Sequence, residues 1–304
     1  MVISTCQDSW IIVTASASFK SHSIALPVGV LAIAMISVQI GAVLVKGLFP
    51  VAGVAGATTL RLGLGSVILA AVWRPWRLRP TAREAGSIFV YGAAMGCMNF
   101  CFYSALSRIP LGIAVALEFT GPLALAIAVS HRAVDYLWVA LAAFGLLALL
   151  PLGHRSISTA GIAFALASGI FWAFYIIFGR KAGVAHGGAT TALGTVVGAL
   201  VIAPMGVVQA GGSLLDPAIL PAALGVALLS SAVPYSLEMF ALTRIPTKTF
   251  GVLLSAEPAL GALSGLAFLH ERLSLIQWAA IASIMAASAG SAATSGPTAP
   301  PIKD

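Results

Sequence analysis

The feature that most constrains this chain is a series of long apolar segments that carry almost no charge. Only 8% of the 304 residues are Asp, Glu, Lys or Arg, and 60% are hydrophobic, whereas a water-soluble domain has roughly a quarter charged residues. A sliding apolar window of about 19 residues predicts ten membrane-spanning helices. The predicted fold class is therefore an all-α membrane protein with ten transmembrane helices. Their expected bounds are 27–45, 53–73, 86–106, 111–129, 136–152, 159–178, 189–208, 218–242, 250–269 and 274–293.

The basic residues are divided unequally between the two predicted sides of the membrane. Eleven fall on the side of the amino terminus and four on the other side. Cytoplasmic loops carry an excess of Lys and Arg, so we expect both termini to lie in the cytoplasm. The eleven are Lys20, Arg74, Arg77, Arg79, Arg83, Arg132, Arg180, Lys181, Arg244, Lys248 and Lys303; the four are Lys46, Arg108, Arg155 and Arg272.

The two halves of the chain contain short matching motifs in the same order. GATT at 56–59 recurs at 188–191, and SRIP at 107–110 recurs as TRIP at 243–246. Each half holds five predicted spans, and an odd number makes the second half enter the membrane in the opposite orientation. We therefore predict a 5+5 inverted-topology repeat, although a duplicated scaffold that no longer moves would carry the same pattern. The expected units are an N-terminal cytoplasmic tail at 1–26, repeats at 27–152 and 159–293, and a C-terminal cytoplasmic tail at 294–304.

Two segments of the sequence carry a resemblance to a known family. GIAVALEFTGPLA at 112–124 and PYSLEMFALTRIPTKTFGVLLSAEPA at 234–259, together with the duplicated ten-span layout, resemble the drug/metabolite transporter superfamily, EamA type. Within that superfamily the chain is similar to the threonine/homoserine exporter group of bacterial inner membranes. The resemblance covers residues 27–293 and implies a central cavity lined by the first four spans of each half, with each fifth span at the periphery.

The resemblance also implies a function. It implies secondary-active export of small amino acids of the threonine/homoserine kind, coupled to protons by alternating access. The expected partners are the amino-acid substrate, protons and the lipid bilayer, with no nucleic acid, and a homodimer is left open. Export of another small metabolite or a drug-like compound on the same fold is the alternative.

Three acidic residues lie inside predicted spans, namely Glu118, Glu238 and Glu257. A charge near the bilayer centre costs at least about 2.5 kcal/mol, so such side chains usually face a cavity or a partner. Burial also favours the neutral form of a carboxyl group, which suits a carrier that binds and releases protons. We expect these residues to exchange a proton or to contact a charged substrate. A helix cap or an interhelical hydrogen bond is the alternative role.

One basic residue, Arg61, lies eight residues inside the second predicted span. Its planar guanidinium group suits a carboxylate. The sequence leaves two roles open for Arg61, which are to bind the carboxylate of the substrate or to form a structural ion pair with Glu118 or Glu257.

Uncharged polar residues and prolines complete the candidate site. Hydrogen-bonding side chains inside the spans are Gln39, Asn99, Tyr103, Tyr175 and Tyr235. A proline removes the backbone hydrogen bond to the carbonyl four residues earlier, so the freed carbonyls could face a cavity or belong to ordinary kinks. The prolines are Pro122, Pro204, Pro234 and Pro258, which free the carbonyls of Glu118, Leu200, Ser230 and Leu254.

Other sequence patterns narrow the function class. The chain has no HExxH motif, intramembrane aspartate pair, Walker A sequence or cluster of His and Cys, so we expect no enzymatic activity, cofactor or metal. Cys97 and Cys101 are interpreted as small packing residues. Three GxxxG pairs favour close helix packing over a homodimer face. They are Gly92/Gly96, Gly194/Gly198 and Gly261/Gly265.

Overall fold

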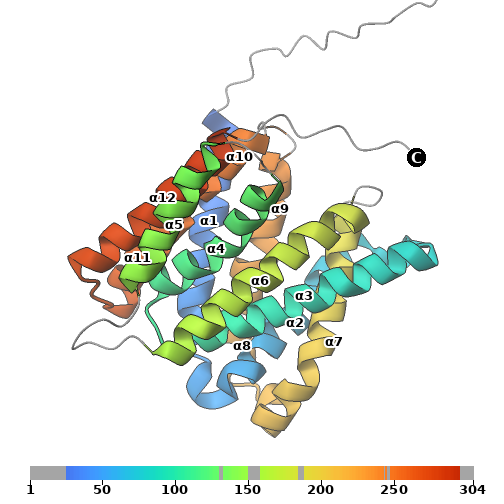
Figure 1. Cartoon of the computed structure of the whole chain (residues 1–304). Coiled ribbons are helices and arrows are strands. Elements are labelled where there is room, and N and C mark those ends of the chain that lie inside the picture. Colours follow the sequence, from blue (N-terminus) through green and yellow to red (C-terminus); the bar gives the residue numbers. More distant parts are fainter. Residues whose placement is uncertain are drawn as a thin grey trace, which may run out of the picture.

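A computed structural model of the chain describes residues 25–129, 133–149, 158–183, 188–242, 244 and 247–294. Every regular element in these ranges is a helix, and the helices pack side by side as a bundle (Figure 1). Their bounds are α1 Ala25–Lys46, α2 Phe49–Trp73, α3 Ala82–Leu106, α4 Leu111–Val129, α5 Asp135–Leu149, α6 Thr159–Gly183, α7 Gly188–Ala210, α8 Leu220–Ala227, α9 Val233–Leu242, α10 Thr247–Leu254, α11 Glu257–Leu269 and α12 Leu275–Thr294. Three short turns are η1 Pro75–Arg77, η2 Gly211–Leu215 and the π-helical η3 Leu228–Ala232.

The helices lie where the apolar segments predicted them. In the described part of the chain, seven helical segments are long and apolar enough to cross a membrane. Shorter apolar helices cover Leu111–Leu125, Asp135–Leu149 and Leu220–Ala232. The eighth predicted span is α8, η3 and α9 in succession, and the ninth is α10 followed by α11. The chain is therefore an all-α protein of multi-pass membrane type. The end of the fifth predicted span, at 150–152, lies outside the described residues. So does the tail predicted at 1–26, except for its last two residues, which begin α1.

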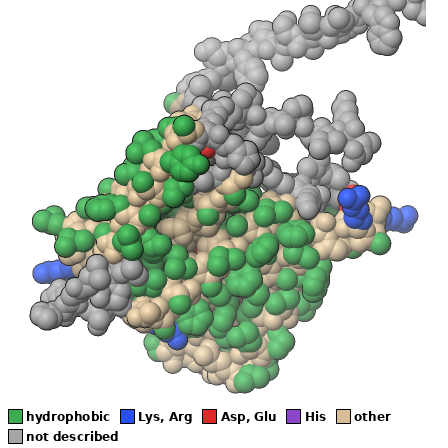
Figure 2. Space-filling model, viewed as in Figure 1, with side chains coloured by type: hydrophobic (Ala, Val, Ile, Leu, Met, Phe, Trp, Pro, Cys, Tyr) green, Lys and Arg blue, Asp and Glu red, His purple; other side chains and the backbone are tan. Residues whose placement is uncertain are grey.

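The surface is apolar over most of the visible face. Hydrophobic side chains cover that face, and the Lys and Arg side chains lie at its margins (Figure 2). Large apolar side chains such as Val208 and Leu275 are each 88% exposed. Water-soluble proteins rarely expose contiguous apolar surface on this scale, so the outer surface of the bundle is suited to lipid.

Two of the GxxxG pairs pack against each other where α3 contacts α7. A Cβ atom added at Gly92 would lie 2.5 Å from the Gly194 carbonyl oxygen, and one at Gly96 would lie 3.0 Å from the Gly198 Cα atom. Only glycine permits such a close approach of the two backbones. These four glycines therefore pack helices within one chain, as the packing interpretation expected.

Helices are interrupted beside two of the prolines, Pro234 and Pro258, whereas α4 and α7 continue through Pro122 and Pro204. Pro258 lies in the first turn of α11, directly after the break at Ser255 and Ala256 that ends α10 at Leu254. Pro234 follows the π-helical turn η3, in which the Val233 N–H bonds to the Leu228 carbonyl. These breaks bring polar backbone into the interior of an otherwise apolar bundle.

Candidate functional site

A cavity of about 580 Å³ lies inside the bundle and collects most of the predicted polar residues. Its wall is formed by residues from α1 to α4, α6, α7, η3 and α9 to α12. The predicted site residues that line it are Gln39, Arg61, Asn99, Tyr103, Glu118, Pro122, Tyr175, Glu238 and Glu257. The sequence therefore identified residues that are far apart in the chain and meet around one cavity.

Three predicted site residues are not among those that line the cavity. Pro234 and Pro258 are buried elsewhere in the bundle, and the side chain of Tyr235 lies outside the described part of the structure. The expectation that both fifth spans are peripheral is wrong for α12, because Ser288, Ser291 and Ala292 contribute to the wall.

Arg61 is held by neutral partners on two neighbouring elements. Its Nε donates to Ser230 Oγ at 2.8 Å, its Nη2 donates to the Ser230 carbonyl at 2.6 Å, and its Nη1 donates to Asn99 Oδ1. The guanidinium carbon also lies 5.4 Å from the centre of the Tyr103 ring. Arg61 is only 6% exposed, so these bonds fix its direction.

Of the two roles that the sequence left open for Arg61, the structural ion pair with an acidic residue is not formed among the described residues. Arg61 pairs with neither Glu118 nor Glu257, all three of which the structure describes. A guanidinium group carries five N–H bonds, and three of them are used by Ser230 and Asn99. Tyr103 also interacts with the Arg61 side chain, so at most two N–H bonds, one on each of Nη1 and Nη2, are left for a further acceptor.

The freed carbonyls are already in contact with protein, contrary to one reading of the prolines. In η3, where Pro234 offers no N–H, the Leu229 carbonyl accepts from Ser37 Oγ at 2.6 Å and the Ser230 carbonyl accepts from Arg61. The Glu118 carbonyl, freed by Pro122, faces Gly169 on α6, where an added Cβ atom would lie 2.6 Å from its oxygen. These prolines therefore direct carbonyls toward neighbouring helices.

The three acidic residues in the spans differ in their partners. Glu118 Oε1 lies 2.5 Å from Ser168 Oγ on α6. Neither Glu238 nor Glu257 forms a hydrogen bond or an ion pair with any residue that the structure describes. A carboxyl group with few fixed partners can change its protonation state without breaking a network.

Gln39 offers a buried acceptor without a partner. Its side chain is 2% exposed and lines the cavity, and its Oε1 atom forms no hydrogen bond among the described residues. Buried polar atoms are normally paired. An unpaired oxygen at the wall of a cavity is therefore a candidate contact for a donor group of a ligand.

The two ends of the bundle differ in how they are closed. The cavity reaches the end formed by Trp73 on α2, Gly188 on α7 and Ser291 on α12, which we call the Trp73 end. At the opposite end, which we call the Lys46 end, Lys46 Nζ lies 2.5 Å from Glu271 Oε1. Glu271 Oε2 accepts from the Leu111 N–H at 2.8 Å.

The Lys46 end is also packed with apolar side chains. Residues of the main core cluster lie there, each at most 4% exposed, namely Val45, Leu48, Leu106, Ile109 and Leu111. The structure is therefore closed at the Lys46 end, while its internal cavity extends toward the Trp73 end.

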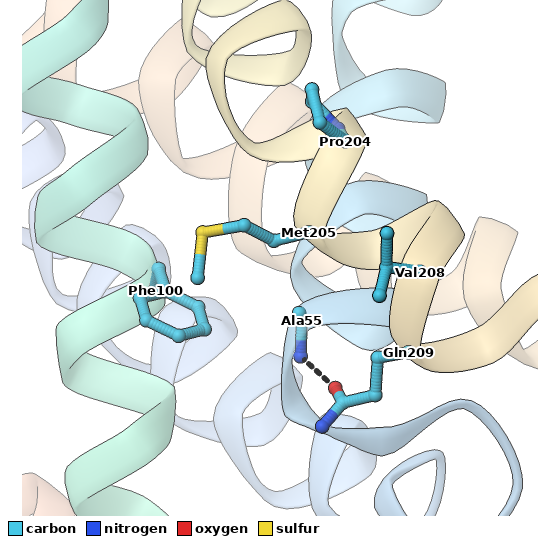
Figure 3. Close-up of a pocket in the computed structure, with 6 residues that line it drawn as sticks. All are labelled: Ala55, Phe100, Pro204, Met205, Val208 and Gln209. Carbon is cyan, nitrogen blue, oxygen red and sulfur yellow. Dashed lines mark hydrogen bonds between the residues drawn. The ribbon is translucent and has the colours of Figure 1, made fainter.

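A second hollow, of about 410 Å³, lies between α2, α3 and α7 (Figure 3). Its wall is mostly apolar, and Gln209 Oε1 accepts from the Ala55 N–H at 2.7 Å. That N–H lies next to a kink in α2 at Gly53, whose φ is +67°. Gln209 therefore has a structural role at the kink, and the described residues that line this hollow include no charged one.

Several residues of the site were missed from the sequence. Ser168 and Glu271 were not singled out, and Ser230 was considered only as part of a proline kink. A serine in an apolar helix usually bonds to its own backbone, so the sequence carries no sign that Ser168 and Ser230 serve other helices. Trp172, whose ring packs edge-to-face on Phe119 at 4.8 Å between centroids, was also missed.

Comparison with known proteins gives consistent results over nearly the whole chain. Residues 159–292 match the EamA-like transporter family. Threonine/homoserine exporter RhtA of Escherichia coli strain K12 is 50% identical over 279 residues, which are 91% of this chain and 95% of that protein. The protein of the same name from Salmonella typhimurium strain LT2 is 53% identical over 271 residues, with 88% and 92% covered.

A solved crystal structure with 16% identity agrees in fold. It has a TM-score of 0.58 and covers 89% of this chain and 96% of that chain. The apolar bundle, with an internal cavity into which several polar side chains are gathered, thus defines a multi-pass membrane protein of the transporter class. The chain belongs to the EamA-like transporter family, as the resemblance in the sequence predicted.

Proposed function

We propose that this chain is a secondary-active exporter of small amino acids of the threonine/homoserine kind, coupled to the proton gradient. The observation that carries the proposal is the 50% identity, over 91% of this chain and 95% of the relative, with a protein named as a threonine/homoserine exporter. The chain acts in the bacterial inner membrane with both termini in the cytoplasm, and the distribution of Lys and Arg supports this orientation.

The cavity offers groups of the right chemistry for a zwitterionic, hydroxylated substrate. The Arg61 N–H bonds that Ser230 and Asn99 do not use, which lie beside Tyr103, suit the carboxylate of the amino acid. The unpaired Oε1 atom of Gln39 suits its ammonium or hydroxyl group. Asn99, Tyr103 and Tyr175 lie around the same cavity as further hydrogen-bonding groups.

Proton coupling is assigned to the carboxyl groups of the same cavity. Glu118 has a single side-chain partner, Ser168, whereas Glu238 and Glu257 have none among the described residues. Their unequal surroundings allow one carboxyl group to bind a proton while another contacts the substrate. We place the coupling proton on Glu118, with Glu257 as the alternative position.

Alternating access is supported by the way in which the helices pair. Exchange of the two predicted repeats maps α1 onto α6 and α3 onto α8–α9. In the structure α1 packs on α9, and the corresponding helix α6 packs on α3. The other helices pack on their own counterparts in the second repeat: α2 on α7, α4 on α11 and α5 on α12. An inverted repeat of this kind lets one bundle open to either side. With the Trp73 end toward the cytoplasm, the present conformation is open inward.

The test is transport by purified protein in vesicles with an imposed pH gradient, against a panel of amino acids and other small metabolites. We expect gradient-driven movement of threonine and homoserine. Movement of a different metabolite, with no movement of either amino acid, would contradict the proposed substrate but support the proposal that the protein is a secondary carrier. A reporter that is active only in the cytoplasm, fused after Asp304, tests the orientation and should be active.

A further inference from the structure

Ser168 lies at a junction of three helices that line the cavity. Its Oγ atom is 2.5 Å from Glu118 Oε1 on α4 and 2.8 Å from the Met98 carbonyl on α3. Ser168 is fully buried. The junction is fixed by close backbone packing, because a Cβ atom added at the adjacent Gly169 would lie 3.2 Å from the Gly121 nitrogen.

Counting protons shows that these two contacts depend on Glu118. A serine hydroxyl has one proton to donate, and the Met98 carbonyl can only accept. When Glu118 is ionised it can only accept as well, so Ser168 donates to one oxygen and leaves the other without a hydrogen. When Glu118 is protonated it donates to Ser168 Oγ, and Ser168 donates its own proton to Met98. Both contacts are then hydrogen bonds.

We propose that Ser168 is a positioning residue that converts the protonation of Glu118 into a hydrogen bond between α6 and α3. This inference rests on the proposed function, in which Glu118 binds the coupling proton. Protonation adds a proton to a Glu118 oxygen, and the Ser168 hydroxyl turns from Glu118 to Met98 with its O–H bond intact. Release of the proton reverses both changes. The proton thus alters the bonding between helices of the cavity wall.

Other groups near Glu118 set the conditions under which this happens. The charged or titratable ones are Arg61 on α2, Cys101 and Tyr103 on α3, and Glu257 on α11. Tyr175 on α6 and Glu238 on α9 line the same cavity. Among the described residues, Ser168 is the group that touches both the Glu118 side chain and a carbonyl of another helix.

The experiment follows the Met98 carbonyl directly. Met98–Asn99 is the only Met–Asn pair in the sequence, so ¹³C-carbonyl methionine combined with ¹⁵N-asparagine gives one selected NMR signal in lipid nanodiscs. We expect this signal to shift with pH in the wild-type protein as the carbonyl gains and loses its hydrogen bond. The shift should be lost in Ser168→Ala and retained in Ser168→Thr, which keeps the hydroxyl.

Two further variants complete the test. Glu118→Gln donates permanently through its amide group, so its signal should stay at the low-pH position at every pH. Ser283→Ala is the matched control, because Ser283 Oγ donates to the Leu141 carbonyl at 2.7 Å between α12 and α5, away from the cavity. The Met98 signal of Ser283→Ala should shift with pH as it does in the wild-type protein. A wild-type signal that does not move with pH, or one that moves equally in Glu118→Gln, would overturn the proposal.

The same samples separate this inference from the proposed function. Gradient-driven transport is measured in parallel for each variant. If the Met98 signal shifts with pH but no substrate is transported by the gradient, the role of Ser168 stands and the proposed exporter function is contradicted. If the gradient drives transport but the Met98 signal does not shift with pH, the exporter function stands and the role of Ser168 is contradicted.

Discussion

The basic and the acidic groups that line the cavity differ in how they are held. Arg61 is bonded to Ser230 and Asn99 and lies beside the ring of Tyr103. By contrast, Glu118 has one side-chain partner, and Glu238 and Glu257 have none among the described residues. A buried charge needs partners to be stable. The cation is thus fixed by its scaffold, while the acidic groups are left able to change protonation.

The largest expected effect follows from loss of the fixed cation. Arg61→Gln removes three hydrogen bonds and leaves the Ser230 carbonyl without its donor, so it should lower the free energy of unfolding by about 2–3 kcal/mol. Denaturation in mixed detergent micelles measures this change.

A double variant tests the partner of Arg61. In the structure the partners are neutral, so adding Glu118→Gln to Arg61→Gln should not restore stability. Restored stability in the double variant would mean that the two residues form an ion pair, since removing one member of such a pair leaves an uncompensated charge.

Ser230 and its neighbour Ser231 provide a matched pair of smaller effect. Ser230→Ala removes the acceptor for Arg61 Nε, and we expect a loss of about 1 kcal/mol. Ser231 is equally buried, but its Oγ atom has no partner among the described residues. Ser231→Ala should therefore be within about 0.5 kcal/mol of the wild type. Equal losses in both variants would show that the scaffold around Arg61 is not what stabilises this region.

A small stability effect is expected at the Lys46 end, where cation and carboxylate do pair. The side chains of Lys46 and Glu271 are 24% and 15% exposed, so Glu271→Gln should cost less than about 1 kcal/mol. Its main effect should be on access. To measure access, a cysteine is placed at Ala42 in a protein whose native cysteines are replaced, and an impermeant thiol reagent is added on the side of the Lys46 end. This cysteine should react faster in Glu271→Gln than in the protein that keeps Glu271. Arg272→Gln, which changes a charge in the same loop, is the control and should leave the rate unchanged.

The sequence predicted the helices better than it predicted the partners of the polar side chains. Apolar length alone located the spans, because a backbone in lipid must be helical. The cost of charge in lipid identified Arg61 and Glu118. Their partners depend on which helices pack together, and nothing in the sequence around Ser168 or Ser230 indicates those neighbours. Sequence reasoning therefore left open whether Arg61 binds the substrate carboxylate or pairs with an acidic residue, and it did not predict that Asn99 and a carbonyl of the π-helical turn hold it.

The central claim is that the loosely held acidic groups of the cavity carry the proton, and that Glu118 is the residue that does so. Transport by Glu118→Gln in proteoliposomes tests this most directly, with threonine exchange at equal pH compared with accumulation driven by a pH gradient. Gln keeps the size and hydrogen bonding of Glu118 but cannot change charge. We predict that exchange persists and driven accumulation is lost. Driven accumulation at the wild-type rate, with normal expression, would contradict the account and leave Glu257 as the proton-binding residue.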